Sequence, residues 1–313
     1  MTITQLQYLL AVNNHRHFAR AAESCFVTQP TLSMQIQKLE EELGVMLFDR
    51  SKHPVKPTAI GEKIIEQARV ITHEAERVFQ ILQESKNQME GVFKLGIIPT
   101  VTADLVPRFL SKFNATFPDI QLQISELTTA EIVERLRKDE LDAAIMATPI
   151  GEKSIIEKPL YYEPFRAFIP HDHKLSKEQF LTNSELDIND ILLLNEGHCF
   201  RNSVINLCNQ KPTLNNQALS LESGNFDILI KLAKKGFGMT LIPYLHALDL
   251  NKEDAKMVKL IAEPQPTREI SIVYSRAELK IKVIEALSKI IKEAVPEKLL
   301  KEKHKILSPV AQV

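Results

Sequence analysis

The stretch TQPTLSMQIQKLEEELG, residues 28–44, decides how the N-terminal part of the chain folds. Thr28 is a residue type that caps the start of a helix, and Pro30 suits the first helical turn. Gly44 suits the left-handed position that follows a helix end. The apolar residues between them recur at intervals of four, three and four, which places them on one helical face: Leu32, Ile36, Leu39 and Leu43. One helix is therefore predicted between Thr28 and Gly44.

Two shorter helices are expected before this one, over residues 3–14 and 18–25, because apolar side chains recur there at helical spacing. Residues 45–58 hold Pro54 and Pro57 among basic side chains, which indicates an irregular loop or a β-wing. Helices joined by a short turn form a helix-turn-helix, whose second helix enters the major groove of DNA. A three-helix unit of this composition could also be a protein-interaction module.

The polar face of the helix supplies candidate DNA contacts. Glutamine can hydrogen-bond adenine, Thr and Ser can reach bases or phosphates, and a proline can contact a thymine methyl group. The candidates are Thr28, Gln29, Pro30, Thr31, Ser33, Met34, Gln37 and Lys38, with Arg50 and Lys52 of the wing as phosphate contacts. The net charge of −1 for the whole chain does not exclude DNA, because acids and bases can lie on different faces.

Residues 59–89 show a different period. Apolar residues alternate at four and three positions, the period of 3.5 that is typical of a coiled-coil seam. We therefore expect a linker helix that pairs with a second copy of the chain; the alternative is a single helix packed on its own domain. The seam is formed by Ile64, Ala68, Ile71, Ala75, Val78 and Leu82.

Strand and helix patterns alternate after residue 90, which predicts α/β folding with a parallel sheet. The alternation recurs in weaker form after residue 166, so two lobes of about 100 residues each are expected, with the chain crossing near residues 164–170 and returning near 265–275. The tail is expected to be a frayed helix or a mobile end. The predicted organisation is 1–58 for the DNA-binding domain, 59–89 for the linker helix, 90–296 for the two-lobed regulatory domain and 297–313 for the tail.

The composition of the chain excludes several classes of protein. Three cysteines in 313 residues cannot form a disulfide scaffold. The first twenty residues do not form a signal peptide, and no run of about 18 apolar residues suggests a membrane span. The sequence therefore predicts a cytoplasmic protein. No spacing of His, Cys, Asp or Glu suggests a metal, and no motif suggests a cofactor.

Several short motifs resemble the LysR-type transcription regulators. That resemblance implies an α/β multidomain protein with a winged helix-turn-helix, a long dimerising linker helix and a two-lobed domain like that of periplasmic binding proteins. It also implies binding to double-stranded promoter DNA, a homodimer or homotetramer, and contact with RNA polymerase. His53, Pro54 and Pro57 depart from the usual wing. The motifs are FARAA at 18–22, TQPTLS at 28–33, QIQKLE at 35–40, LG at 43–44, LFDR at 47–50 and TAIG at 58–61.

The segment GHCFR, residues 197–201, carries the most specific chemistry. Cys199 lies between His198 and Arg201, and the apolar spacing that follows predicts a helix beginning at the cysteine. Cations and helix N-termini lower a thiol pKa and so favour the reactive thiolate. Cys208 lies nine residues further on, while Cys25 is expected to be a core residue. The alternative is that Cys199 and Cys208 are neighbours by chance.

Helix geometry limits what this pair can do. Nine steps of about 1.5 Å separate the two Cα atoms by roughly 13 Å, whereas a disulfide needs them within about 7 Å. Cys199 and Cys208 can therefore pair only if the helix between them unwinds. Such a disulfide would act as a switch rather than as a permanent crosslink.

Residues 197–201 and the cysteine spacing resemble the hydrogen-peroxide sensors of the same family. That resemblance implies that Cys199 is oxidised by peroxide and forms a disulfide with Cys208, in a non-enzymatic activator of oxidative-stress genes. Asn202 replaces a usual acidic residue. Without the resemblance, Thr100 and Thr129 would be interpreted as helix N-caps. The implied peroxide pocket consists of Thr100, Thr129, His198 and Arg201.

Two other functions remain open from the residues. A LysR-type regulator could instead bind a small anionic metabolite between its lobes, with Thr100 and Thr102 at a helix N-terminus. A thiol peroxidase would use the same cysteines for turnover, but nothing in the chain resembles its usual scaffold.

Overall fold

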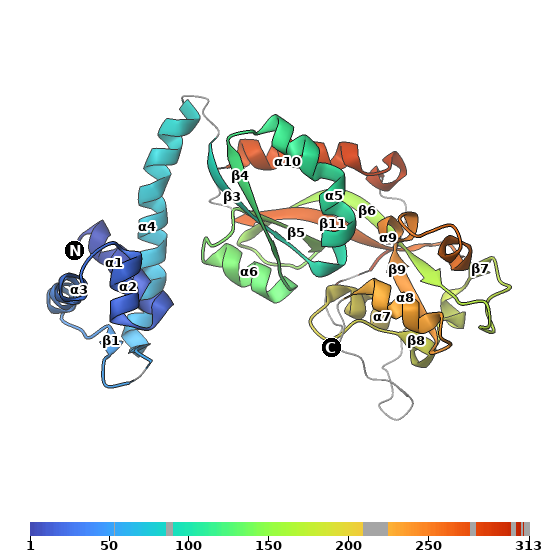
Figure 1. Ribbon diagram of the computed structural model, residues 1–313, viewed down its shortest axis with the longest axis horizontal. Coiled ribbons are helices and arrows are strands. Elements are labelled where there is room, and N and C mark those ends of the chain that lie inside the picture. Colours follow the sequence, from blue (N-terminus) through green and yellow to red (C-terminus); the bar gives the residue numbers. More distant parts are fainter. Residues whose placement is uncertain are drawn as a thin grey trace. The chain divides into compact units, whose positions relative to one another are not determined.

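The computed structural model describes residues 1–52, 54–85, 90–208, 225–275, 280–301, 305–307 and 309. The chain divides into two compact units, Met1–Gln88 and Met89–Val313 (Figure 1). None of the helices in these described ranges is long and apolar enough to cross a membrane.

The first unit contains the predicted helix-turn-helix. Thr28 caps α3, since its hydroxyl accepts from the Thr31 N–H at 3.5 Å, and Gly44 ends the helix with a φ of +67°. The apolar face of α3 is buried against α1 and α2. The three helices are α1 (Ile3–His15), α2 (Phe18–Ser24) and α3 (Gln29–Leu43).

A small wing follows α3. It consists of the antiparallel strands β1 (Phe48–Asp49) and β2 (Lys56–Pro57), after which α4 (Ala59–Ser85) begins. A Cβ at Gly61 would lie 2.1 Å from the Leu47 carbonyl oxygen, so only glycine lets the first turn of α4 approach the wing this closely. His53 lies outside the described residues.

Helix α4 has two different parts. Ile65 and Ala68 are buried in the core of the first unit, where α4 packs on α1. Val78, further along, is 58% exposed. The interpretation of α4 as a helix on its own domain is therefore right for its first half, and the coiled coil stays a prediction for its second half.

The first lobe of the second unit is a sheet with helices on both faces. Strands β3, β4 and β5 are parallel, and β11 adds an antiparallel neighbour. Helices α5 and α10 pack together on one face, and α6 lies on the other (Figure 1). The bounds are β3 (Gly91–Ile97), α5 (Pro99–Thr116), β4 (Ile120–Glu126), α6 (Thr129–Arg137), β5 (Ala143–Thr148), β11 (Pro266–Ser275) and α10 (Ile281–Ala294).

The long strand β6 (Ile155–Phe168) carries the chain into the second lobe, and the chain returns through β10 and β11. Each lobe has its own buried core, as the sequence predicts. The remaining elements are β7 (Phe180–Leu181), η1 (Asn183–Glu185), η2 (Ile188–Asp190), β8 (Ile191–Leu192), α7 (Cys199–Cys208), α8 (Phe226–Ala233), β9 (Met239–Pro243), α9 (Tyr244–Leu248), η3 (Asp254–Met257) and β10 (Val258–Ile261).

The beginning of the tail is packed, contrary to the expectation of a frayed or mobile end. A 3-10 turn, η4 (Glu297–Leu300), buries Leu299 in the core of the first lobe. Strand β12 (Lys305–Ile306) pairs in parallel with β11, and Leu307 is buried in the core of the second lobe. Two apolar side chains thus anchor a segment whose lysines suggested a solvated end.

Candidate functional site

Cys199 is the first residue of α7, as the sequence predicts. Gly197 has a φ of +92°, a conformation that glycine adopts without strain, and it turns the chain into the helix. The Cys199 side chain is buried, with 6% of its surface exposed. The thiol is therefore a protected group and not a surface cysteine.

A buried arginine on β11 is the cation beside this thiol. Arg268 is 2% exposed; its Nε and Nη2 donate to Glu163 Oε2 at 2.9 and 2.7 Å. Nη1 donates to the Thr100 hydroxyl and Nη2 to the Thr100 carbonyl, each at 2.9 Å. Glu163 Oε1 accepts from the Leu245 N–H at 2.8 Å. These bonds fix the guanidinium between β6, α5 and the start of α9.

The pKa of Cys199 reflects two opposing effects. Burial raises it above the usual value for a thiol, while Arg268, the Thr129 hydroxyl and the N–H groups of Cys199 and Phe200 lower it. Burial outweighs these effects. The cation that lowers this pKa is Arg268, and not His198 or Arg201 as the sequence suggests, whereas the N–H groups at the start of α7 act as expected of a helix N-terminus.

The surroundings of His198 and Arg201 differ from those of the Cys199 thiol. His198 is buried, and desolvation lowers its pKa although Glu126 opposes this, so the ring is neutral at pH 7. Arg201 donates from Nη1 to the Leu194 carbonyl at 3.0 Å. This bond holds the loop before α7.

A cavity of about 400 Å³ lies between the lobes. Thr100 and His198 line it, whereas Thr129, Cys199 and Arg201 do not. The sequence-predicted pocket is thus only partly assembled around the cavity. Its lining is Pro99, Thr100, Ala103, Asp104, Glu126, His198, Asn225, Phe226, Asp227 and His246.

The two threonines are not helix caps. Ile98 precedes α5 and caps it without a side-chain bond, and Thr128 caps α6. The Thr129 hydroxyl is buried beside the Cys199 thiol. Thr100 and Thr129 are thus free of a capping role and available to the site.

Cys208 is the last residue of α7, at the far end from Cys199. Its side chain is buried, and desolvation together with the Asp187 carboxylate raises its pKa to about 11. Both thiols are free in this structure. Helical geometry separates the two Cα atoms by about 13 Å, so α7 holds the pair apart.

The helix α3 presents an exposed polar face in the first unit. Arg50 is expected in the wing as a phosphate contact. It instead forms an ion pair with the buried Glu40 at 2.7 Å, and its guanidinium lies over the Phe18 ring. Lys52 is exposed, 3.6 Å from Asp49. Of the other predicted DNA contacts, Ser33 is half-buried and the rest are exposed: Thr28, Gln29, Pro30, Thr31, Met34, Gln37 and Lys38.

No group of three or more His, Cys, Asp or Glu residues within the described ranges could hold a metal ion. Cys25 is half-buried at the end of α2, where it packs on the core of the first unit.

Known solved structures share this architecture. A full-length OxyR from Pseudomonas aeruginosa is 33% identical with a TM-score of 0.77, covering 93% of this chain and 98% of that one. An H2O2-bound OxyR mutant from Corynebacterium glutamicum is 27% identical with a TM-score of 0.61, covering 94% and 92%.

Curated relatives point to the same group of proteins as the solved structures. The "Hydrogen peroxide-inducible genes activator" of Pectobacterium carotovorum is 34% identical over 274 residues, covering 88% of this chain and 90% of the relative. The "DNA-binding transcriptional dual regulator OxyR" of Escherichia coli K12 is 33% identical over 307 residues, covering 94% and 100%. Residues 3–62 match the bacterial regulatory helix-turn-helix model of the lysR family, and residues 86–296 match the LysR substrate binding domain. The chain belongs to the LysR family of transcriptional regulators and resembles its OxyR members.

Proposed function

We propose that this chain is a DNA-binding transcriptional activator that senses hydrogen peroxide through Cys199 and Cys208. The observation that carries the proposal is the pair of buried thiols at opposite ends of α7, one of them beside a buried guanidinium. The names of the relatives, which are regulators of hydrogen peroxide-inducible genes, support the same signal.

The first chemical step is oxidation of Cys199. Its thiolate attacks one oxygen of H2O2, the O–O bond breaks, and the leaving oxygen departs as water after taking up a proton; Cys199 becomes a sulfenic acid. Arg268 stabilises the thiolate by its charge, and the N–H groups at the start of α7 stabilise it by the helix dipole. Thr100 and His198 line the cavity, and in this proposal they hydrogen-bond peroxide on its way to the thiol.

The second step forms the disulfide. The sulfur of Cys208 attacks the sulfenic sulfur of Cys199, the S–S bond forms, and the hydroxyl leaves as water with the proton of Cys208. The two sulfurs can meet only if α7 unwinds. Unwinding removes Phe200, Val204 and Leu207 from the core of the second lobe, so the chemistry is coupled to a change of shape.

The output is a change at DNA. Helix α3 would read base edges with its exposed face, from Gln29 to Lys38, and Lys52 would contact phosphates. We infer that the chain acts in the cytoplasm as a homodimer or homotetramer paired through the second half of α4, and that it contacts RNA polymerase. In this proposal Arg50 positions the wing through Glu40 and does not itself bind DNA.

Thiol titration and DNA footprinting test the switch together. One equivalent of peroxide should remove two thiols per chain and change the footprint on DNA upstream of the chain's own gene. Cys208→Ser should abolish the footprint change, whereas Cys25→Ser should keep it. A peroxide-induced footprint that survives Cys208→Ser rules out the disulfide switch.

A metabolite sensor would give a different result. It would ignore peroxide and lose its response in Thr100→Val. A thiol peroxidase would consume many equivalents of peroxide in the presence of a reductant.

A further inference from the structure

Strand β6 contributes side chains to two separate sites, because successive side chains of a strand point to opposite faces. Glu163 and Phe165 face the thiol site, where Glu163 binds Arg268 and the Phe165 ring lies 4.6 Å from the Phe200 ring. The alternate residues line a second cavity of about 400 Å³: Tyr162, Pro164 and Arg166. This second cavity shares no lining residue with the one beside Cys199.

Arg166 is the unusual residue of the second cavity. Its side chain is 8% exposed, yet its hydrogen bond is to a neutral group, the Phe165 carbonyl, at 2.9 Å. Within the described ranges Arg166 forms no ion pair. The Glu163 carboxylate is paired with Arg268 instead, and the Glu263 carboxylate affects the Arg166 pKa only through its charge, without contact. Burial lowers the pKa of Arg166. A buried guanidinium without a carboxylate is costly unless an anion binds it.

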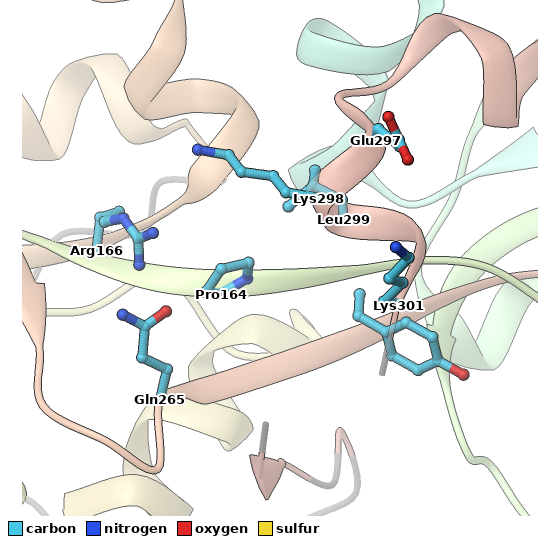
Figure 2. A pocket seen from close by; sticks show the side chains of 8 residues that line it. Pro164, Arg166, Gln265, Glu297, Lys298, Leu299 and Lys301 are labelled. Carbon is cyan, nitrogen blue, oxygen red and sulfur yellow. The ribbon is translucent and has the colours of Figure 1, made fainter. Parts of the chain in front are cut away.

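A second cation converges on the same place. The Arg166 guanidinium lies 5.1 Å, and the Lys298 ammonium 4.3 Å, from the centroid of one ring, that of Tyr244. Figure 2 shows Lys298 extending over Pro164 toward Arg166, while the Glu297 carboxylate points away from them. Lys301 completes the basic lining, and in the described part of the chain neither lysine is in an ion pair.

The remaining lining suits a small organic molecule. Gln265 offers an amide donor and acceptor, and Pro164 and Leu299 offer apolar surface. A cavity of this size lies within the range of small-molecule sites, which combine apolar walls with a few fixed polar groups. The planar guanidinium matches a carboxylate or a phosphate, with two parallel hydrogen bonds.

We propose that Arg166, Lys298 and Lys301 form a binding site for a small organic anion carrying a carboxylate or phosphate group. The anionic group lies between Arg166 and Lys298, and the carbon skeleton rests on Pro164 and Leu299. The site goes beyond peroxide sensing and does not depend on it.

Calorimetry of the reduced full-length chain tests the site with two probes, citrate and inorganic phosphate, at constant ionic strength. We expect saturable binding of one equivalent of at least one probe. Lys298→Gln changes an exposed residue and should weaken binding about fivefold, the usual effect of one exposed ion pair. Arg166→Gln should weaken it at least about thirtyfold, since it removes a buried charged partner.

Two control variants make the result decisive. Lys153→Gln removes an exposed lysine elsewhere in the second unit and should leave binding unchanged. Cys199→Ser should also leave it unchanged, which separates this site from the peroxide switch. Binding of citrate alone assigns a carboxylate ligand, and binding of phosphate alone assigns a phosphate ligand. No saturable binding of either probe, or binding unaffected by Lys298→Gln, overturns the proposal.

Discussion

At the scale of single residues, Cys199 must be protected and reactive at the same time. Burial keeps its thiol neutral, and Arg268 supplies the charge that stabilises the thiolate once it forms. Arg268 is itself balanced by Glu163, so the site contains a paired charge and not an isolated one.

The raised pKa of Cys199 predicts a steep pH dependence. Only the thiolate reacts with peroxide, and below the pKa its fraction rises about tenfold for each pH unit. The second-order rate of Cys199 oxidation in Cys208→Ser should therefore rise about tenfold per pH unit from about pH 6 to 8. Stopped-flow detection of the sulfenic acid measures it. A rate independent of pH over this range would show that the pKa is lowered instead.

Replacement of Arg268 separates stability from reactivity. Arg268→Met leaves Glu163 buried and unpaired, which should cost about 3 kcal/mol of unfolding free energy. The double variant Glu163→Gln/Arg268→Met has no buried charge here and should recover most of that loss in chemical denaturation. Cys199 oxidation should stay slow in both variants because the cation is gone. Normal oxidation in the double variant would refute the role of Arg268.

The residues of the site differ in how well the sequence predicts them. Cys199, Cys208 and His198 lie in one short segment, so a local pattern reveals them. Arg268 comes from a distant strand and reaches the thiol only through the pairing of β11 with β6. The strand that carries it also holds Glu269 and several hydroxyl side chains, so its sequence does not single out Arg268 or name a partner.

At the scale of elements, the polar start of α3 depends on one cap. Thr28→Ala should cost about 1 kcal/mol of unfolding free energy, because the Thr31 N–H loses its acceptor. Thr28→Ser keeps the hydroxyl and should retain stability. Chemical denaturation of the two variants compares them directly. Equal losses in both would mean that the threonine methyl group, and not the cap, stabilises the helix.

Periodicity predicts these helices well, since α1, α3 and the first half of α4 bury one apolar face each. It does not predict the full length of β6, whose fourteen residues mix charges, prolines and aromatic rings. From Glu163 to Phe168 every residue of β6 is buried, charged ones included, because neighbouring strands cover it, a tertiary effect. Local sequence patterns do not predict the packed start of the tail for the same reason, because its pairing partner, β11, is remote in sequence.

At the scale of the whole molecule, we expect two chains to pair through the second half of α4. Val78 belongs to the predicted seam and is 58% exposed; Val70 lies on the same helix outside the seam and is 49% exposed. Val78→Glu should shift the protein toward the monomer in light scattering, because a charge in a coiled-coil seam is unfavourable.

Val70→Glu is the matched control and should leave the oligomeric state unchanged. If both variants remain fully dimeric, the chains associate through another surface.

Glu163 links the chemistry to the architecture. One oxygen holds Arg268 and the other holds the backbone at the start of α9, so a single carboxylate ties β6, β11 and α9 together. Arg268 extends the tie to Thr100 on α5. We expect a shift of the Arg268 guanidinium on oxidation of Cys199 to pass through Glu163 into β6, the strand that runs from the first lobe into the second.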